Sequence, residues 1–537
     1  MNHQSDVKPH VPRQAIFKSA KNNATIIQRR ELIEYPAVAL SQTVLVGQDD
    51  SNKKITFNIS GDALVDGRES FFSVKLKTNK WTAHLSSDIT SIIKRVTLSL
   101  PHNQNLILED INDYNTLASI CHFASADDTQ LESNWYSGMN CLAKFNRSGS
   151  GSSARRFLTI HEEGEYRTIC FQLNLSGIMS SENYIPLVLL NGIKIDIHLE
   201  TAGNAFHYDA DNERDFGSVF AVTDTPFSKG YASMSPEERV VVTDHIKAMT
   251  NREDPDPNSP LTYTVHSPMF HAQTIFMSPS YIDSLIKASE SQNGVTISYD
   301  TFRMNRITPQ SPYCSYAFVD SVQNLKNIYM ATQSRDTSLT THFNYFCRAL
   351  KSFTFRVGSR IYNKVDVQVP ALALASTLIS MGKFGTYQTH NLNSKDYFTS
   401  KNVHSFDFQN AKHDSKSAHS GLNTTNGRYL RLEMEFNEAP SVSVVSPTDN
   451  TVLATFNPVA GYSQVHLTTF LEYSKMIRIL WNPLYRVSGS LSLSLLSLSR
   501  ISSTSPLSAF EATSTQILIP IPPKSSINFF IVFSGCS

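Results

Sequence analysis

Residues 190–199 read Leu-Asn-Gly-Ile-Lys-Ile-Asp-Ile-His-Leu. From Ile193 to Leu199 every second side chain is apolar, and the side chains between them are polar. This period of two is typical of a β-strand with one buried face, because successive side chains in a strand point to opposite sides. Asn191-Gly192, directly before the alternation, is a turn signal. The segment therefore predicts a turn followed by a half-buried strand.

The same alternation recurs along the chain, at residues 96–100, 169–175, 353–357 and 430–436. Helix signals are few. Ser235-Pro236 and Ser278-Pro279 each place a capping serine before a proline at the first helical position. Many short strands with two helices favour antiparallel sandwiches or jelly rolls over an alternating parallel sheet. We therefore predict an all-β chain with a few short helices in the connections.

Length and composition are those of a folded chain with more than one core. The chain has 537 residues, several times the length of a typical domain. Lys+Arg and Asp+Glu both number 47, which excludes a highly charged disordered chain and argues against a surface that wraps nucleic acid throughout. No apolar run approaches the ~20 residues that a membrane helix needs, so we predict no membrane span. The six cysteines form no C-x-x-C pair and are predicted to be isolated thiols.

A search for chemical motifs finds no phosphate-binding glycine loop, no dinucleotide fingerprint and no nucleophile elbow. His161-Glu-Glu lacks the second histidine of a zinc-protease helix, and the acidic stretch 209–215 has Arg214 where a calcium loop needs glycine. His266 and His271 are five residues apart in an apparent strand, so we expect them on opposite faces and not on one metal. We therefore predict no catalytic residue, no cofactor, no metal site and no enzymatic activity.

Residues 175–199 resemble a block of the double jelly-roll major capsid proteins, in particular those of Polinton/Maverick elements, adintoviruses and polinton-like viruses. The resemblance rests on Leu175-Ser-Gly-Ile-Met, on Tyr184-Ile-Pro-Leu and on the strand that ends at Leu199. Asn191 stands where the family commonly has the first of two glycines. Four further blocks resemble family segments in the same order along the chain: residues 55–61 with 71–77, 91–100 with 108–115, 353–360 with 371–375, and 470–479.

The resemblance implies two consecutive eight-stranded jelly rolls. It also implies a major capsid protein that trimerises into pseudo-hexameric capsomers and tiles the icosahedral shell of a double-stranded DNA virus or virus-like element. Its partners would be further copies of the chain, penton and minor capsid proteins, and at most weak contact of the N-terminal arm with the genome. Its location would be the virion, after assembly inside the host cell.

We divide the chain into four parts: an N-terminal arm at residues 1–50, a first jelly roll at 51–288, a second jelly roll at 289–485 and an atypical C-terminal tail at 486–537. The tail departs from the family pattern after Asn482. We interpret it either as a strand arm that docks on a neighbour or as a segment without an evolved fold. Residues 394–427, rich in Ser, Asn, Lys and His, are predicted to form a long surface excursion.

Two other functions stay open. A jelly roll also serves as a carbohydrate-binding or attachment protein, which would need an aromatic platform on exposed loops. The loops at 144–156 and 394–427 contain Phe145, Tyr397, Phe398, Phe406 and Phe408 but no organised tryptophan shelf. A glycosidase needs a pair of carboxylates across a cleft, and sequence spacing does not reveal such a pair. The ordered resemblance and the lack of a catalytic motif favour the capsid interpretation.

Overall fold

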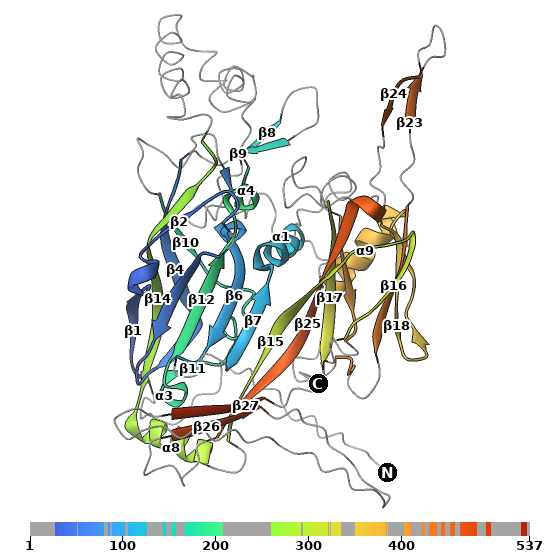
Figure 1. Ribbon diagram of the computed structural model, residues 1–537. Helices are drawn as coiled ribbons and strands as arrows, with labels where there is room; N and C mark the ends of the chain where they lie inside the picture. The colour runs from blue at the N-terminus through green and yellow to red at the C-terminus, as the bar shows by residue number, and fades with distance from the viewer. Residues whose placement is uncertain are drawn as a thin grey trace, which may run out of the picture.

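In the computed structural model, the described part of the chain forms two antiparallel β-sandwiches that lie side by side (Figure 1). The structure describes residues 27–50, 52–79, 84–85, 89–101, 106–125, 143–146, 153–156, 167–207, 259–290, 294–319, 322, 324–334, 350–382, 384, 402–409, 421–424, 429–437, 442–445, 452–456, 462–480, 490–495 and 528–533. The helix signal at Ser235, the His161-Glu-Glu stretch and the acidic stretch 209–215 lie outside the described residues.

The first sandwich has eight main strands. In chain order they are β1 (Ile27–Pro36), β3 (Lys54–Ile59), β4 (Leu64–Thr78), β6 (Ile93–Ser99), β7 (Ile107–Asn112), β10 (Arg167–Phe171), β12 (Ile193–Leu199) and β14 (Tyr263–Met277). One sheet has the order β1-β14-β4-β10, and the other has the order β3-β12-β6-β7. The first strand therefore pairs with the eighth and the second with the seventh, which is the topology of a jelly roll.

The second sandwich repeats this topology. Its eight main strands are β15 (Val295–Ile307), β16 (Tyr313–Ala317), β17 (Leu325–Ser334), β18 (Leu350–Val357), β19 (Arg360–Ile361), β21 (Val403–Asp407), β22 (Leu430–Phe436) and β25 (Val465–Leu480). One sheet runs β21-β17-β25 with β15 on the far side of β25, and the other runs β16-β22-β18-β19. The predicted fold class, two consecutive eight-stranded jelly rolls, is confirmed.

Short elements fill the connections. The helices are η3 (Ala39–Ser41), η4 (Ile89–Ile92), α1 (Tyr114–Ser125), α3 (Leu187–Leu190), α4 (Ala202–Ala205), α8 (Pro279–Glu290), α9 (Pro370–Ser380) and η8 (Tyr462–Gln464). The minor strands are β2 (Thr43–Val46), β5 (His84–Leu85), β8 (Ala143–Asn146), β9 (Ser153–Arg156), β11 (Ile185–Pro186), β13 (Phe206–His207), β20 (Val365–Asp366), β23 (Val442–Val445) and β24 (Val452–Phe456). Among the described residues, no helix combines the length and the apolar character that crossing a membrane requires.

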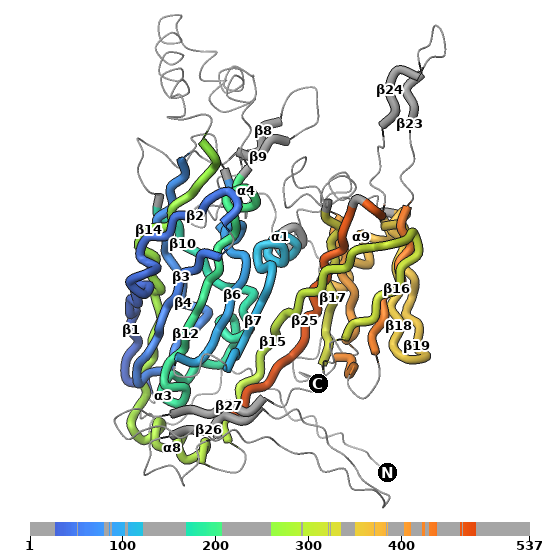
Figure 2. Tube along the Cα trace, viewed as in Figure 1, coloured from blue at the N-terminus to red at the C-terminus, as the bar shows by residue number. Residues whose placement is uncertain are grey.

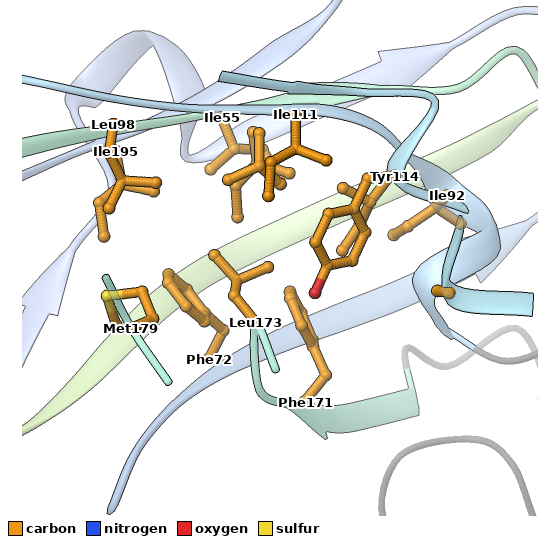
Figure 3. Packing of buried hydrophobic residues seen from close by; sticks show 14 of the residues in the cluster. Ile55, Phe72, Ile92, Leu98, Ile111, Tyr114, Phe171, Leu173, Met179 and Ile195 are labelled. Atoms are coloured by element: carbon orange, nitrogen blue, oxygen red, sulfur yellow. The ribbon is translucent and has the colours of Figure 1, made fainter. Parts of the chain in front are cut away.

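Each sandwich encloses an apolar core built from the alternating strands. In the first, Leu98 and Ile195 come from paired strands of one sheet and lie across the core from Phe72 of the other (Figure 3). All three side chains are at most 1% exposed. Burying one such side chain stabilises the fold by about 1.5–3 kcal/mol. The period of two in the sequence therefore reflects which side chains of each strand face this core.

The helix that follows Ser278 is confirmed as α8, and it connects β14 of the first sandwich to β15 of the second (Figure 2). It begins at Pro279, as the capping serine and the proline predict. The strands at 193–199 and 430–436 are confirmed as β12 and β22 with the same bounds. Strict alternation of apolar and polar residues explains why these two strands could be delimited from the sequence.

The predicted N-terminal arm, residues 1–50, ends earlier than expected. Both β1 and β2 pair with β14, so residues 27–46 belong to the first sandwich. The strand at 27–36 was missed because it carries four charged residues, among them Arg30 and Glu34, and shows no clean alternation. Charged side chains are common on edge strands, where they discourage pairing with other chains.

The surface excursion predicted at 394–427 is wrong for its central part. Residues 403–407 form β21, the sixth strand of the second sandwich. The polar composition of this stretch gives no sign of a buried strand. Asn402 and His404 are nonetheless fully buried, and His404 Nε2 lies 2.8 Å from Asn402 Oδ1. The pair supplies a hydrogen bond between its own members, although the Asn402 Nδ2 is buried without a partner among the described residues.

Two strands lie inside the predicted C-terminal tail. β26 (Ser490–Leu495) pairs antiparallel with the end of β25, and β27 (Asn528–Phe533) pairs parallel with β26. Both strands extend a sheet of the second sandwich, and in Figure 1 they lie below the first sandwich, near α8. Docking of the tail on a neighbouring chain stays a prediction.

Candidate functional site

The two sandwiches meet where β7 of the first lies against β15 and β25 of the second. The backbone carbonyl of Leu108 accepts two hydrogen bonds there, from the Tyr299 hydroxyl at 2.5 Å and from the Lys475 ammonium at 2.7 Å. Burial raises the pKa of Tyr299 well above 10, and the nearby Glu109 carboxylate adds to this rise. Tyr299 therefore stays protonated and remains a donor across the contact.

Glu109 follows Leu108 on β7, and its carboxylate organises the next part of the contact. The side chain is 1% exposed and accepts hydrogen bonds from the Ser176 hydroxyl, from the Gly177 amide at 2.8 Å and from the Ile178 amide at 3.4 Å. Burial raises the pKa of Glu109, although the bonds from Ser176 and Gly177 act in the opposite direction. The carboxylate thus holds residues 176–178 in one shape, because it is the shared acceptor of three donors.

Gly177 brings this turn into direct contact with the second sandwich. A Cβ atom on Gly177 would lie 1.6 Å from the carbonyl oxygen of Asp300 on β15. Only glycine therefore fits at this position. The Asp300 carboxylate is held in turn by Lys326 at 2.7 Å and by Ser474 at 2.7 Å, which ties β15 to β17 and β25.

Helix α1 forms a second contact between the sandwiches. At its start Asp113 forms an ion pair of 2.7 Å with Arg306 of β15. Further along, burial and the nearby Glu472 of β25 raise the pKa of the Cys121 thiol to about 12. Glu472 itself accepts hydrogen bonds from Asn327 at 2.7 Å and from Tyr329 at 2.8 Å, and burial raises its pKa.

We call this set of contacts the junction: Leu108, Glu109, Ser176, Gly177, Ile178, Tyr299, Asp300 and Lys475. Apolar side chains of both sandwiches pack into one continuous cluster around it, for example Ile111 and Ile178 with Phe302 and Ile477. A buried apolar contact with satisfied polar groups resists relative motion of the parts that it joins. The junction therefore fixes the two sandwiches against each other.

Three of the five sequence blocks quoted above meet at or beside the junction. Glu109 belongs to the block 91–100 with 108–115, Gly177 to the block 175–199 and Glu472 to the block 470–479. Within the first of these blocks, the Ser91 carbonyl accepts a hydrogen bond from Asn115 at the start of α1. Sequence reasoning quoted these residues as a family pattern and did not find that they touch. Glu109 and Gly177 are 68 positions apart along the chain, and Glu472 lies still further away, so no local signal reveals their contact.

A groove of about 400 Å³ opens beside the junction, between β7, β15 and β25. Its charged lining consists of Asp110, Arg303 and Lys475. Asp110 is bound by Arg95 through two hydrogen bonds, of 2.6 and 2.7 Å. Among the described residues that line this groove, Asp110 is the one carboxylate, whereas a glycosidase would need two.

The two histidines of β14 differ from the prediction. His266 lies opposite Lys75 and His271 opposite Phe71, and these partners are four residues apart on one face of β4. Both histidines therefore lie on the same face, because the strand is irregular around Ser267, which has a φ of 47°. Four residues of strand separate them by about 13 Å, too far for one metal ion. Within the described residues, no cluster of three metal-ligating side chains occurs.

His271 belongs to a hydrogen-bonded row across three strands. Its Nε2 lies 2.8 Å from the Ser73 hydroxyl, and its Nδ1 lies 3.4 Å from the Glu34 carboxylate. The order of groups is that of a serine hydrolase, but the Glu34 side chain is 59% exposed, whereas the carboxylate of such a triad is buried. The row connects β1, β14 and β4 on the outer face of the sheet.

The structure describes some of the loop aromatic residues considered for a carbohydrate platform. Phe406 and Phe408 pack against Phe355 and Tyr362 inside the second sandwich, with ring centroids 5.0 to 5.7 Å apart. Phe408 is 5% exposed. Phe408 is therefore a core residue, and Phe406 is half-buried against that core, so the two rings do not form an exposed platform. Tyr397 and Phe398 lie outside the described residues, and of Phe145 only the backbone strand β8 is described.

Two jelly rolls in one chain, joined by a buried junction, define a double jelly-roll protein. Among solved structures, the chain is similar to the quasi-atomic model of the PBCV-1 virus capsid, with a TM-score of 0.47 and 9% identity over 84% of this chain and 95% of that one. It is also similar to the Faustovirus major capsid protein, with a TM-score of 0.46 and 10% identity over 83% of this chain and 90% of that one.

The mavirus major capsid protein is a third similar structure, with a TM-score of 0.42 and 10% identity over 91% of this chain and 98% of that one. No protein-family model matches the sequence, and no curated protein matches it. At such low sequence identities the similarity shows the fold alone, and one fold can serve many functions.

Proposed function

We propose that this chain is a major capsid protein of a double-stranded DNA virus or virus-like element. It trimerises into pseudo-hexameric capsomers that tile an icosahedral shell, and it resides in the virion after assembly inside the host cell. The observation that supports this proposal most is the junction. It joins two jelly rolls of identical strand order, and it is built from the sequence blocks that resemble this family.

The proposed mechanism is geometric. Each chain supplies two equivalent sandwiches in a fixed relation, so a ring of three chains presents six similar units. Such a ring fits a position in the shell lattice that has six neighbouring positions. The formal net charge of zero lets many copies pack closely without strong mutual repulsion.

The remaining assignments belong to the same proposal. We place the division between the two jelly rolls after residue 288, inside α8, and we place the chain with the Polinton/Maverick, adintovirus and polinton-like group on its sequence blocks. The partners are further copies of the chain, penton and minor capsid proteins, and weak contact of the N-terminal residues with the genome. The proposal assigns no catalytic residue, cofactor or metal. The buried position of Phe408 and the half-buried position of Phe406, packed on Phe355, speak against the alternative, a carbohydrate-binding protein.

Light-scattering chromatography of the purified full-length chain tests the proposal. The expected main species has three times the chain mass of 60.0 kDa, and larger sheets or shells grow as the concentration rises. A species of one chain mass at all salt and protein concentrations would contradict it. A glycan array probed with the same sample checks the alternative function, for which specific binding is the supporting result.

A further inference from the structure

The groove between the two sandwiches has the lining of a small-molecule site. It opens beside the junction, where β7, β15 and β25 lie side by side (Figure 1), and its volume is about 400 Å³. Volumes of this size are typical of ligand sites, which combine apolar and aromatic side chains with a few polar groups. All three strands contribute apolar or aromatic side chains to the lining: Ile107, Phe302, Met304 and Tyr473.

The charged side chains of the groove favour an anion. Two cationic side chains line it, Arg303 of β15 and Lys475 of β25, and Arg303 is exposed. The Asp110 carboxylate also lines the groove, but the Arg95 guanidinium binds it through two hydrogen bonds of 2.6 and 2.7 Å. This bidentate pair compensates the charge of Asp110. Arg303 and Lys475 therefore leave the groove with an excess of positive charge.

The amine of Lys475 is fixed where the groove meets the junction. Its Nζ donates a hydrogen bond of 2.7 Å to the Leu108 carbonyl. Burial lowers the pKa of Lys475 from 10.5 to about 8, although the Glu109 and Asp110 carboxylates act in the opposite direction. The amine is therefore mostly charged at pH 7 and about half neutral at pH 8. The charged form attracts an anion, and the neutral form is a nucleophile toward an aldehyde.

We propose that this groove binds a small aromatic molecule that carries an anionic group such as a phosphate. Arg303 and Lys475 hold the anionic group, and the Phe302 and Tyr473 side chains pack against the aromatic body. The bound molecule lies between β7 of the first sandwich and β15 and β25 of the second, so it adds to the contacts between them. All of these residues belong to one chain, and the inference does not depend on the proposed capsid role.

Pyridoxal 5′-phosphate is a suitable probe, because it joins an aromatic ring, a phosphate and an aldehyde. The neutral Lys475 nitrogen bonds to the aldehyde carbon, and the two nitrogen protons leave with the carbonyl oxygen as water, which gives a C=N bond. Sodium borohydride then adds a hydride to the carbon of this bond, and water supplies a proton to the nitrogen. The resulting secondary amine is stable, so mass spectrometry measures how much of Lys475 has reacted.

The test treats the full-length chain at pH 8 with pyridoxal 5′-phosphate and, in parallel, with pyridoxal, which lacks the phosphate. Each rate at Lys475 is divided by the rate at Lys287, an exposed lysine of α8. We expect the normalised rate at Lys475 to be about tenfold higher with the phosphate than without it, as one charge-assisted hydrogen bond gives. Equal normalised rates, or an unmodified Lys475 beside a modified Lys287, would overturn the inference.

The variant Arg303→Gln tests the anion-binding residue. It should lower the rate of pyridoxal 5′-phosphate at Lys475 about tenfold and leave the rate of pyridoxal unchanged. Arg360→Gln is the matched control and should keep both rates, because Arg360 is also an exposed arginine of the second sandwich and lies over the Tyr362 ring, outside the groove lining. An unchanged phosphate-dependent rate in Arg303→Gln would contradict the proposed site.

Circular dichroism checks that Arg303→Gln is folded. If it is not, pyridoxine 5′-phosphate, which lacks the aldehyde, replaces the variant as a competitor on the wild-type chain. It should slow the modification of Lys475 and leave that of Lys287 unchanged, and an equal rate at Lys475 with and without the competitor would overturn the inference. Light scattering of the same samples reports the oligomer, so a failure of the proposed function is recognised separately from a failure of this site.

Discussion

The backbone of Gly177, in the first sandwich, lies directly against the carbonyl oxygen of Asp300 in the second. The amide of Gly177 is at the same time a donor to the buried carboxylate of Glu109, at 2.8 Å. The point where the two sandwiches approach most tightly is thus also the point where a buried acid fixes the backbone. The relative position of the two jelly rolls depends on this small set of atoms.

Replacing Gly177 by alanine should separate the two sandwiches locally. The added methyl would stand 1.6 Å from the Asp300 oxygen, so the turn or β15 has to move. We expect the free energy of unfolding to fall by about 1–3 kcal/mol, as for other overpacked sites, and the oligomer to weaken. Thermal unfolding and light scattering measure both effects. Gly203→Ala is the control, because its new Cβ would meet its nearest atoms at an ordinary 3.5 Å. An unchanged melting temperature for Gly177→Ala would show that the contact is not tight.

Replacing Glu109 by glutamine should destabilise the junction without changing its volume. The amide keeps one acceptor oxygen but places an NH₂ group where a donor from the 176–178 turn now points. An unsatisfied buried donor costs about 1–3 kcal/mol, which denaturant unfolding measures. Glu182→Gln is the control, since the Glu182 side chain is 85% exposed and should change stability little. Equal stability of both variants would speak against a structural role for Glu109.

The thiol of Cys121 should resist alkylation in the folded chain. Its pKa of about 12 leaves the reactive thiolate at a fraction of about 10⁻⁴ at pH 8. Mass spectrometry after iodoacetamide treatment should find Cys121 unmodified in native buffer and modified in denaturant. Loss of this protection in Gly177→Ala would show that the junction holds α1 against β25. Rapid native labelling of the wild-type chain would contradict the packing of α1 on the second sandwich.

Acid should weaken the second sandwich through His404. Burial lowers the pKa of this histidine from 6.5 to about 3, so the folded chain keeps the ring neutral while the unfolded chain binds a proton below pH 6.5. The site's contribution to stability is complete above pH 6.5 and is lost as the pH falls toward 3. Between pH 7 and pH 5 we expect a loss of about 2 kcal/mol.

His404→Gln removes this titration and keeps a hydrogen-bonding partner for Asn402. Denaturant unfolding at pH 7 and pH 5 should therefore show a smaller loss of stability for the variant than for the wild type. The same loss in both chains would mean that His404 does not titrate as its burial implies. The comparison isolates one group, because all other titrating groups are shared by both chains.

The fold was predictable wherever alternation is strict. The strand 430–436 has four apolar and three charged residues in perfect order, and its bounds agree with the structure. β1 escaped prediction because four of its ten residues are charged and most of the strand is exposed, and β21 because several of its buried groups are polar, among them His404, which bonds Asn402. Both strands owe their place to tertiary contacts, which override local composition.

The junction was predictable in its residues but not in its geometry. Ser176-Gly177 stood out as part of a family-like block, yet its role depends on Glu109 and Asp300, which lie far away in the sequence. The face shared by His266 and His271 was missed for a similar reason. An irregular backbone at Ser267 shifts which side chains of β14 point to each face, and the residue types in the sequence do not predict this irregularity.

Cryo-electron microscopy of the purified oligomer tests the central proposal most directly. The account predicts a ring with threefold symmetry in which six sandwiches are visible. The angle between sandwiches within a chain should match the angle between chains. A closed ring with another number of sandwiches, or an isolated chain at every concentration, would contradict the account.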